Sequence, residues 1–152
     1  MIDRKICFIC SAGGHLEQLR QLKGVREEFN SFFVVPDVAS TEKMIDRTYK
    51  IPVLNHGRSY GLTLLRLAFR EFAILIKERP THIISTGAAP AIPMMLLGRL
   101  LGSKTIYIES FARRNELNRT GKFLYKKVDL FIVQWPELKE RYPDSAYWGW
   151  IY

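Results

Sequence analysis

Short runs of apolar residues alternate along this chain with longer stretches in which apolar residues recur every three or four positions. Apolar runs bounded by turn residues are typical of buried strands, and the longer period is typical of amphipathic helices. The runs predict strands at Lys5–Cys10, Ser31–Val35, Lys50–Leu54, His82–Ser85, Thr105–Glu109 and Leu130–Val133. The stretches between them predict helices at Gly14–Phe29, Ser40–Asp46, Tyr60–Glu78, Pro90–Leu101, Thr120–Lys127 and Pro136–Tyr142.

This alternation predicts an α/β fold, a single Rossmann-like domain over residues 1–152 with a parallel sheet covered by helices on both faces. In such sheets, ligands bind beyond the carboxyl ends of the strands. The segments that follow strands, and therefore share this edge, are Ser11–His15, Asp37, His56–Ser59, Ser85–Pro90 and Glu109–Arg114. His82 begins a strand, so it is expected at the opposite edge in a structural role.

Two turns of small residues on that edge predict an anion site. One joins the first strand to the first helix, and the other leads into the helix that starts near Pro90. Glycine lets backbone approach a ligand closely, and the positive end of a helix dipole favours a phosphate. The residues that we expect to bind phosphate in these turns are Ser11, Gly13, Gly14, Thr86 and Gly87.

Two titratable side chains on the same edge are candidates for proton transfer. His15 opens the first predicted helix, where the dipole disfavours a cationic imidazole, so a neutral ring is available as a base. A capping or packing role is the alternative for His15. Glu109 ends a strand and precedes Arg113 and Arg114, which are expected to hold phosphate bidentately. Glu109 is expected either to act on a sugar hydroxyl or to pair with an arginine of its own loop.

Positive charge is concentrated in the middle of the chain. The net charge is +8, and residues 58–127 carry 13 basic and 4 acidic residues. Such a field suits nucleic acid, an anionic membrane or a phosphorylated substrate. We expect no nucleic-acid partner, because the basic residues are not interleaved with aromatic ones. A dinucleotide enzyme is also disfavoured: Asp37 lies where a ribose-binding acid belongs, but the first turn lacks G-x-G-x-x-G.

The cysteines and the apolar runs limit the remaining classes. Cys7 and Cys10 lie within a predicted strand, where an offset of three residues places them on opposite faces, so we expect buried, reduced thiols. No cluster has metal-ligand spacing, and no metal or cofactor is expected. No apolar run approaches the roughly 18 residues that span a bilayer, and no signal peptide is visible. We therefore expect a cytoplasmic protein that touches a membrane without crossing it.

The predicted helix Tyr60–Glu78 is apolar on more than one face. One stripe holds Leu62, Leu65, Phe69, Phe72, Ala73 and Ile76, and the second holds Leu64, Leu67, Ala68, Ile74 and Leu75. A helix that is apolar all round is usually buried, but flanking arginines also suit a membrane surface. The residues that we assign to a membrane-facing surface are Leu64, Leu67, Arg70 and Ile74.

Five stretches occur in an order associated with one family: Ser11–His15, Thr86-Gly87 with Pro93, Ile108–Arg113, Thr120-Gly121-Lys122 and Val133–Leu138. On these residues the chain resembles the oligosaccharide-biosynthesis family that includes the membrane-recruiting subunit of the eukaryotic two-chain UDP-GlcNAc transferase. It looks still closer to small bacterial members of the PssD/CpsF type in capsule and exopolysaccharide synthesis. The resemblance covers essentially the whole chain.

The resemblance implies one half of a GT-B glycosyltransferase. In MurG, the N-terminal domain receives the lipid-linked acceptor and the C-terminal domain receives the nucleotide sugar, whereas in this family the two halves are separate chains. This chain is similar to the acceptor half. Gly13, Gly14 and His15 match a turn near the acceptor diphosphate, and Glu109 matches a glutamate after the fifth strand. The implied partners are a donor-binding glycosyltransferase subunit, a lipid-linked glycan and the membrane surface. Eukaryotic members carry an N-terminal transmembrane helix that this sequence lacks, so attachment is expected through the surface.

Aromatic residues crowd the segment 143–152 at the end of the chain. They either pack on their own sheet or form an interface with the donor-binding partner, and we favour the interface. The residues assigned to it are Trp135, Tyr147, Trp148 and Trp150. A non-catalytic scaffold that recruits a complete transferase, and a self-sufficient nucleotide-binding enzyme, remain as alternatives to the acceptor-binding subunit.

Overall fold

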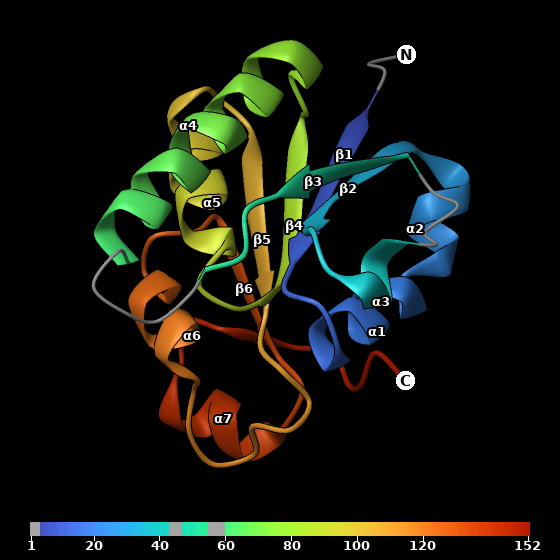
Figure 1. Cartoon of the computed structure of the whole chain (residues 1–152). Coiled ribbons are helices and arrows are strands. Elements are labelled where there is room, and N and C mark those ends of the chain that lie inside the picture. Colours follow the sequence, from blue (N-terminus) through green and yellow to red (C-terminus); the bar gives the residue numbers. More distant parts are fainter. Residues whose placement is uncertain (1–3, 43–46, 55–59) are drawn as a thin grey trace.

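The computed structural model describes residues 4–42, 47–54 and 60–152, and its centre is one seven-stranded sheet (Figure 1). The strand order is β3-β2-β1-β4-β5-β6-β7, and every neighbouring pair is parallel. The strands are β1 Lys5–Cys10, β2 Asn30–Pro36, β3 Thr48–Ile51, β4 His82–Gly87, β5 Lys104–Ile108, β6 Leu130–Val133 and β7 Ala146–Tyr147. The predicted parallel α/β sheet is confirmed. The predicted segment His56–Ser59 and the end of the predicted helix Ser40–Asp46 lie outside the described residues.

Helices cover both faces of this sheet. The pair α4 and α5 lies on one face, and α1 and α2 lie on the other (Figure 1). The helices are α1 Gly14–Gln21, α2 Lys23–Glu28, α3 Ala39–Glu42, α4 Tyr60–Glu78, α5 Ala91–Leu100, α6 Arg119–Leu124 and α7 Pro136–Arg141.

The core consists of two apolar clusters, one on each face of the sheet. The larger includes Cys7 with Leu67 of α4 and Met94 of α5, and the smaller includes Cys10 with Leu16 of α1. The two cysteines are therefore buried on opposite faces, as predicted. Burial raises the pKa of the Cys10 thiol to about 12, so a reactive thiolate is disfavoured there.

The order of the strands reverses between β1 and β4. The chain proceeds from β1 outward to β2 and β3, and then places β4 on the other side of β1. The register shifts at the carboxyl ends of this pair, where Ile9 lies opposite Ser85 and Cys10 lies opposite Gly87. The residues that follow these two strands consequently emerge side by side, at the point where ligands bind in open α/β sheets.

Two local features differ from the sequence prediction. The helix predicted over Gly14–Phe29 is interrupted at Leu22, where a ψ of 42° separates α1 from α2. Strand β7, which was not predicted, is a short parallel edge strand within the aromatic segment 143–152.

The orientation of α4 contradicts part of the predicted membrane-facing surface. Leu67 and Ile74 are buried and Leu64 packs against the core, whereas Arg70 is exposed. The exposed apolar side chains belong to the other stripe: Leu62, Leu65, Phe69, Phe72 and Ile76. We call this stripe the α4 surface. The prediction was wrong because both stripes are apolar, so periodicity could not show which of them packs on the sheet. No described helix is both long and apolar enough to cross a membrane.

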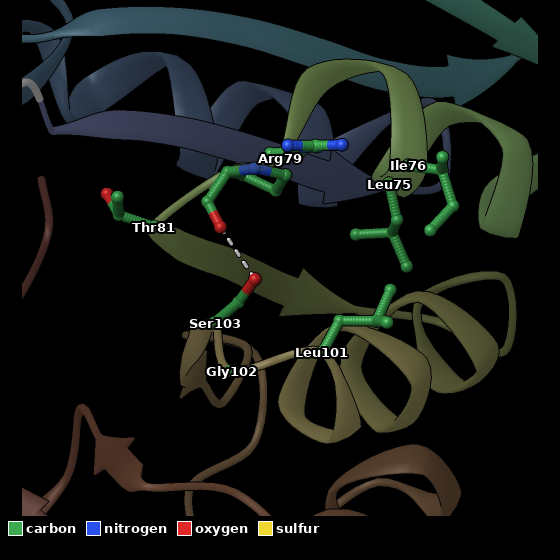
Figure 2. A pocket seen from close by; sticks show the side chains of 8 residues that line it. Leu75, Ile76, Arg79, Thr81, Leu101, Gly102 and Ser103 are labelled. Atoms are coloured by element: carbon green, nitrogen blue, oxygen red, sulfur yellow. Dashed lines mark hydrogen bonds between the residues drawn. The ribbon is translucent and has the colours of Figure 1, made fainter.

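A separate pocket of about 490 Å³ lies at the other edge of the sheet, between the ends of α4 and α5. Figure 2 shows Leu75 and Ile76 of α4 beside Leu101, which follows α5. The hydroxyl of Ser103 donates a hydrogen bond to the backbone carbonyl of Pro80 (2.6 Å) and ties the two chain turns together (Figure 2). His82 begins β4 at this edge, as predicted, remote from the carboxyl ends of the strands.

Candidate functional site

The turn after β1 leaves backbone open to a ligand. Gly13 is the N-cap of α1 with a φ of 84°, a value that favours glycine, and no side chain caps the helix. Gly13 and Gly14 are exposed, and a Cβ on either would meet no atom within 4 Å. First-turn amides of α1 are therefore available to an anion.

His15 is fixed to the end of β4 by two hydrogen bonds. Its Nδ1 lies 2.7 Å from the backbone oxygen of Thr86, and the Thr86 hydroxyl donates to the backbone oxygen of His15 (2.6 Å). A carbonyl oxygen only accepts, so Nδ1 carries the proton and Nε2 keeps the lone pair. Burial, with a smaller effect from the positive charge of Arg113, lowers the pKa of His15. The lowered pKa favours the neutral ring, and the role of His15 as a base stays a prediction.

Gly87 makes room for this ring. Its φ is 124°, and a Cβ there would lie 2.9 Å from Cε1 of His15 and 3.0 Å from the hydroxyl oxygen of Tyr107. Thr86 and Gly87, which were predicted to bind phosphate, thus lie against His15 and orient it.

Glu109 is fully buried below the loop that joins β5 to α6. Its Oε1 accepts hydrogen bonds from the amide of Ser110 (2.8 Å) and from Nδ2 of Asn118 (2.6 Å), and its Oε2 accepts from the backbone N–H of Asn118 (3.1 Å). Burial raises the pKa of Glu109 to about 7, although these hydrogen bonds lower it. Within the described ranges no ion pair joins Glu109 to a loop arginine, although the positive charge of Arg113 also lowers the pKa of Glu109.

A cleft of about 410 Å³ opens beside His15. It is lined by His15, Ala88, Ser110, Ala112, Arg113, Asn118, Arg119 and Thr120. In the described part of the chain, the guanidinium groups of Arg113 and Arg119 have no hydrogen-bonding or ion-pair partner. Two free cations beside a neutral imidazole suit a phosphate-bearing ligand with a hydroxyl to deprotonate.

Comparison with known proteins places this chain in a family. A model of the family described as "Oligosaccharide biosynthesis protein Alg14 like" matches residues 57–151. The UDP-N-acetylglucosamine transferase subunit ALG14 of Homo sapiens is 38% identical over 96% of this chain and 82% of its own length. The subunit of the same name from Yarrowia lipolytica is 30% identical over 95% of this chain and 80% of its own length.

The chain belongs to the Alg14-like family of oligosaccharide-biosynthesis proteins.

Solved structures show the fold of the Alg14-like chain. MurG from Acinetobacter baumannii has a TM-score of 0.75 at 15% identity, covering 88% of this chain and 42% of its own. A UDP-N-acetylglucosamine 2-epimerase from Rickettsia bellii has a TM-score of 0.73 at 13% identity, covering 97% of this chain and 45% of its own. The Alg14-like chain thus has the predicted fold of the N-terminal half of GT-B proteins and spans less than half the length of either structure.

Several predicted site residues of the Alg14-like chain lie away from the cleft. Arg114 forms two hydrogen bonds to Oε1 of Glu137 (2.9 and 2.7 Å) and stacks over Trp135. It does not line the cleft, contrary to the prediction that it holds phosphate. Ser11 is half-buried directly after β1. Asp37, considered for a dinucleotide, is exposed after β2.

The prediction of phosphate-binding residues missed four polar residues that line the cleft: Ser110, Asn118, Arg119 and Thr120. A local signal existed for them. Asn118 caps α6 by accepting a hydrogen bond from the amide of Gly121 (2.7 Å), and the spacing of Asn118 and Gly121 is typical of a helix start at the edge where ligands bind.

Aromatic rings of the Alg14-like chain gather beside the same loop. Phe111 contacts Trp135, Trp150 and Tyr152, with ring centroids 4.9, 5.6 and 5.5 Å away. Trp148 is 72% and Trp150 57% exposed. The end of the chain therefore packs partly on its own domain and still presents aromatic surface.

Proposed function

We propose that this chain is the acceptor-binding, membrane-associated subunit of a two-chain UDP-sugar glycosyltransferase. The transferase adds a sugar to a glycan carried on a polyprenyl diphosphate, and a partner chain binds the UDP-sugar. The observation that carries the proposal is the cleft in which His15 lies with the free guanidinium groups of Arg113 and Arg119. Relatives named as UDP-N-acetylglucosamine transferase subunits support the class of reaction.

The diphosphate of the acceptor is the ligand that the cleft suits best. Arg113 and Arg119 offer two planar cationic forks, which bind phosphate oxygens bidentately. The exposed turn at Gly13 and Gly14 adds backbone amides at the positive end of α1. We expect Arg113→Gln and Arg119→Gln each to weaken binding of inorganic pyrophosphate, and Arg114→Gln to leave it unchanged.

The lone pair of His15 Nε2 is the proton acceptor in this proposal. As the acceptor hydroxyl oxygen forms its bond to the anomeric carbon of the sugar, its proton passes to Nε2 and UDP leaves with the electrons of the broken bond. Glu109 is buried and saturated with hydrogen bonds, so its role is to position Asn118 and the loop that carries Arg113.

His15→Ala tests the chemical role. We expect transfer to fall by roughly a hundredfold or more, the range typical of a lost general base, while the partner still co-purifies. Full activity would remove His15 from the mechanism. Loss of co-purification would instead assign His15 a structural role.

Attachment to a membrane through the α4 surface is a further part of the proposal. Its exposed apolar side chains lie on the helix that carries the exposed Arg66 and Arg70, a composition that suits the interface of an anionic bilayer. We expect the chain to bind phosphatidylglycerol vesicles, and Phe69→Ser to weaken that binding. Phe123→Ser, an equally drastic change at an exposed phenylalanine of α6, is the matched control. Equal loss in both variants would contradict attachment through α4.

The aromatic end of the chain is the proposed docking surface for the donor-binding subunit. Trp148, Trp150 and Tyr147 are exposed, and Trp135 contacts Trp150 with 5.4 Å between ring centroids. Trp148→Ala should weaken co-purification of the partner, whereas Phe123→Ala should not. Unchanged co-purification in Trp148→Ala and Trp150→Ala would overturn this interface.

A reconstituted transfer assay decides between a catalytic subunit and a scaffold. We would combine labelled UDP-sugars and lipid-linked acceptor with this chain, the donor-binding chain, or both. Transfer that requires both chains supports the two-chain enzyme. We also propose that the chain lies on the cytoplasmic membrane face and serves a bacterial capsule or exopolysaccharide pathway of the PssD/CpsF type. Equal transfer by the donor-binding chain alone favours the scaffold, and transfer by this chain alone favours a self-sufficient enzyme.

A further inference from the structure

The side chain of Gln134 links the end of the chain to the loop after β5. It is 1% exposed and uses its whole amide group. Its Nε2 donates to the backbone oxygen of Glu109 (2.9 Å) and to Oε1 of Gln18 (3.2 Å), and its Oε1 accepts from the backbone N–H of Ile151 (3.0 Å). The carbonyl of Glu109 only accepts and the N–H of Ile151 only donates, so the orientation of the amide is fixed.

Gln18 of α1 extends this link into the loop itself. Its Oε1 also accepts from the backbone N–H of Phe111 (3.3 Å), and its Nε2 donates to the Ser110 hydroxyl (3.3 Å). The backbone oxygen of Phe111 accepts from Nε1 of Trp135 (2.7 Å). Both backbone polar groups of Phe111 are therefore held, and with them the loop that leads to Arg113.

The other end of the link lies in the exposed segment Trp148–Tyr152. The side chain of Ile151 packs against the core cluster on the α1 face of the sheet, while its neighbours Trp150 and Tyr152 are exposed and contact Phe111. One short segment thus has a buried anchor and an exposed aromatic surface. A protein that binds Trp150 and Tyr152 would contact the residues on both sides of the Ile151 amide.

We propose that Gln134 is a positioning residue through which docking of a partner protein on Trp148–Tyr152 sets the loop of Glu109 and Arg113. The inference rests on the function proposed above. The Ile151 amide holds Gln134, Gln134 holds the carbonyl of Glu109, and Gln18 holds Phe111. The partner then completes the acceptor cleft in addition to supplying the sugar donor.

A pair of substitutions at one position isolates the first step of the link. Ile151→Pro removes the N–H that donates a hydrogen bond to Gln134, whereas Ile151→Val keeps the N–H and a branched apolar side chain. Each is made in the wild-type chain and in Gln134→Met. Two quantities are measured on the full chain: the affinity for inorganic pyrophosphate by calorimetry, and the titration of the Glu109 carboxyl by NMR.

We expect Ile151→Pro to weaken pyrophosphate binding roughly three- to tenfold, the effect of one lost hydrogen bond. It should also move the titration of Glu109 toward lower pH, because a loosened loop admits water to a carboxyl whose pKa is raised by burial. Ile151→Val should change neither quantity. In the Gln134→Met background, Ile151→Pro should add nothing, since coupled residues are not additive.

Two results would overturn the inference: an unchanged Glu109 titration in folded Ile151→Pro, or equal effects of Ile151→Pro with and without Gln134. Failure of the proposed function is a different result, namely no pyrophosphate binding by the wild-type chain, and the titration still tests the link in that case. If Gln134→Met does not fold, Gln134→Leu replaces it, since leucine is likewise apolar and offers neither a donor to Glu109 nor an acceptor to Ile151.

Discussion

The carboxylate of Glu109 occupies the space in which a side chain at position 121 would lie. A Cβ built on Gly121 would overlap Oε2 of Glu109 and come within 3.3 Å of its Cδ. Gly121 lies inside α6, where glycine costs about 0.5–1 kcal/mol relative to alanine. The helix therefore gives up intrinsic stability at this position and leaves room for the buried carboxylate.

Substitution of two helical glycines by alanine separates the cost of glycine in a helix from the space that Glu109 requires. A Cβ added at Gly24 of α2 would meet no atom within 4 Å, so Gly24→Ala should stabilise the chain by about 0.5–1 kcal/mol. Gly121→Ala should destabilise it by about 1–3 kcal/mol through overpacking against Glu109. Urea unfolding measures both. A stabilised Gly121→Ala would contradict the position of the carboxylate.

The raised pKa of Glu109 predicts a pH-dependent contribution to stability. Burial raises that pKa to about 7 in the folded chain, above the roughly 4.3 of an exposed glutamate. The contribution of Glu109 to the free energy of unfolding is therefore fully present below the unfolded pKa, and it is lost as pH rises through the folded pKa. Relative to Glu109→Gln, the wild-type free energy of unfolding should fall by roughly 3 kcal/mol between about pH 4 and pH 7. Urea unfolding of both chains across this range provides the measurement, and parallel pH profiles would contradict the raised pKa.

Gly87 and Gly102 form a second informative pair. Both have positive φ, 124° and 91°, so alanine at either position costs about 1–2 kcal/mol of backbone strain. Only at Gly87 does a Cβ also meet His15, since nothing lies within 4 Å at Gly102. We expect both variants to lose stability, but only Gly87→Ala to shift the imidazole resonances of His15 and weaken pyrophosphate binding. The same NMR change in Gly102→Ala would show that strain alone is responsible.

Glu71 of α4 is a buried carboxyl that we expect to destabilise the fold. It is fully buried, and among the described residues neither of its oxygens has a hydrogen-bond partner of ordinary geometry. Burial raises the pKa of Glu71 well above its usual range, and the nearby Met94 amide offsets only part of this. We expect Glu71→Met to stabilise the chain by about 1–4 kcal/mol at pH 7. The gain should shrink as pH falls toward the unfolded pKa, because the unfolded wild-type chain then already carries the proton that burial of Glu71 favours.

Glu78 provides the matched control on the same helix. It is also buried, but Arg47 lies 2.7 Å and Lys5 3.4 Å from its oxygens, and Tyr49 donates a hydrogen bond to it. Glu78→Met should therefore destabilise the chain, by about 1–3 kcal/mol. Thermal unfolding at pH 5 and pH 8 compares the two. Destabilisation by Glu71→Met at both pH values would contradict the unpartnered state of Glu71.

The parts of the fold that depend on local pattern could be predicted from the sequence. The bounds of β1, α4 and β6 agree with the prediction, because each is an apolar run or helical stretch closed by turn residues. The break lies at Leu22, which is neither glycine nor proline, and the nearby Gly24 lies within α2 rather than at the break. Strand β7 is two residues long, and pairing with β6 defines it more than its own sequence does.

The candidate site could be predicted only as far as the rule that ligands bind beyond the carboxyl ends of parallel strands. That rule placed His15, Glu109 and Arg113 together, since each follows a strand at the same edge. Sequence alone could not show that Arg114 pairs with Glu137 or that Arg119 lines the cleft, because side-chain direction within a loop has no periodicity. Glu71, an acidic residue on the buried stripe of α4, likewise gave no sign of which stripe packs on the sheet.

The hydrogen bond between Gln18 and Gln134 joins residues 116 positions apart. Parallel pairing already makes every sheet contact a distant one, and the entropy of closing long loops delays such contacts during folding. We therefore expect a growing chain to pair β1, β4 and β5 before β6 brings Gln134 into place, so that the loop beside the cleft is ordered late. A chain that ends before β6 is then expected to form part of the sheet without the hydrogen bonds of Gln134.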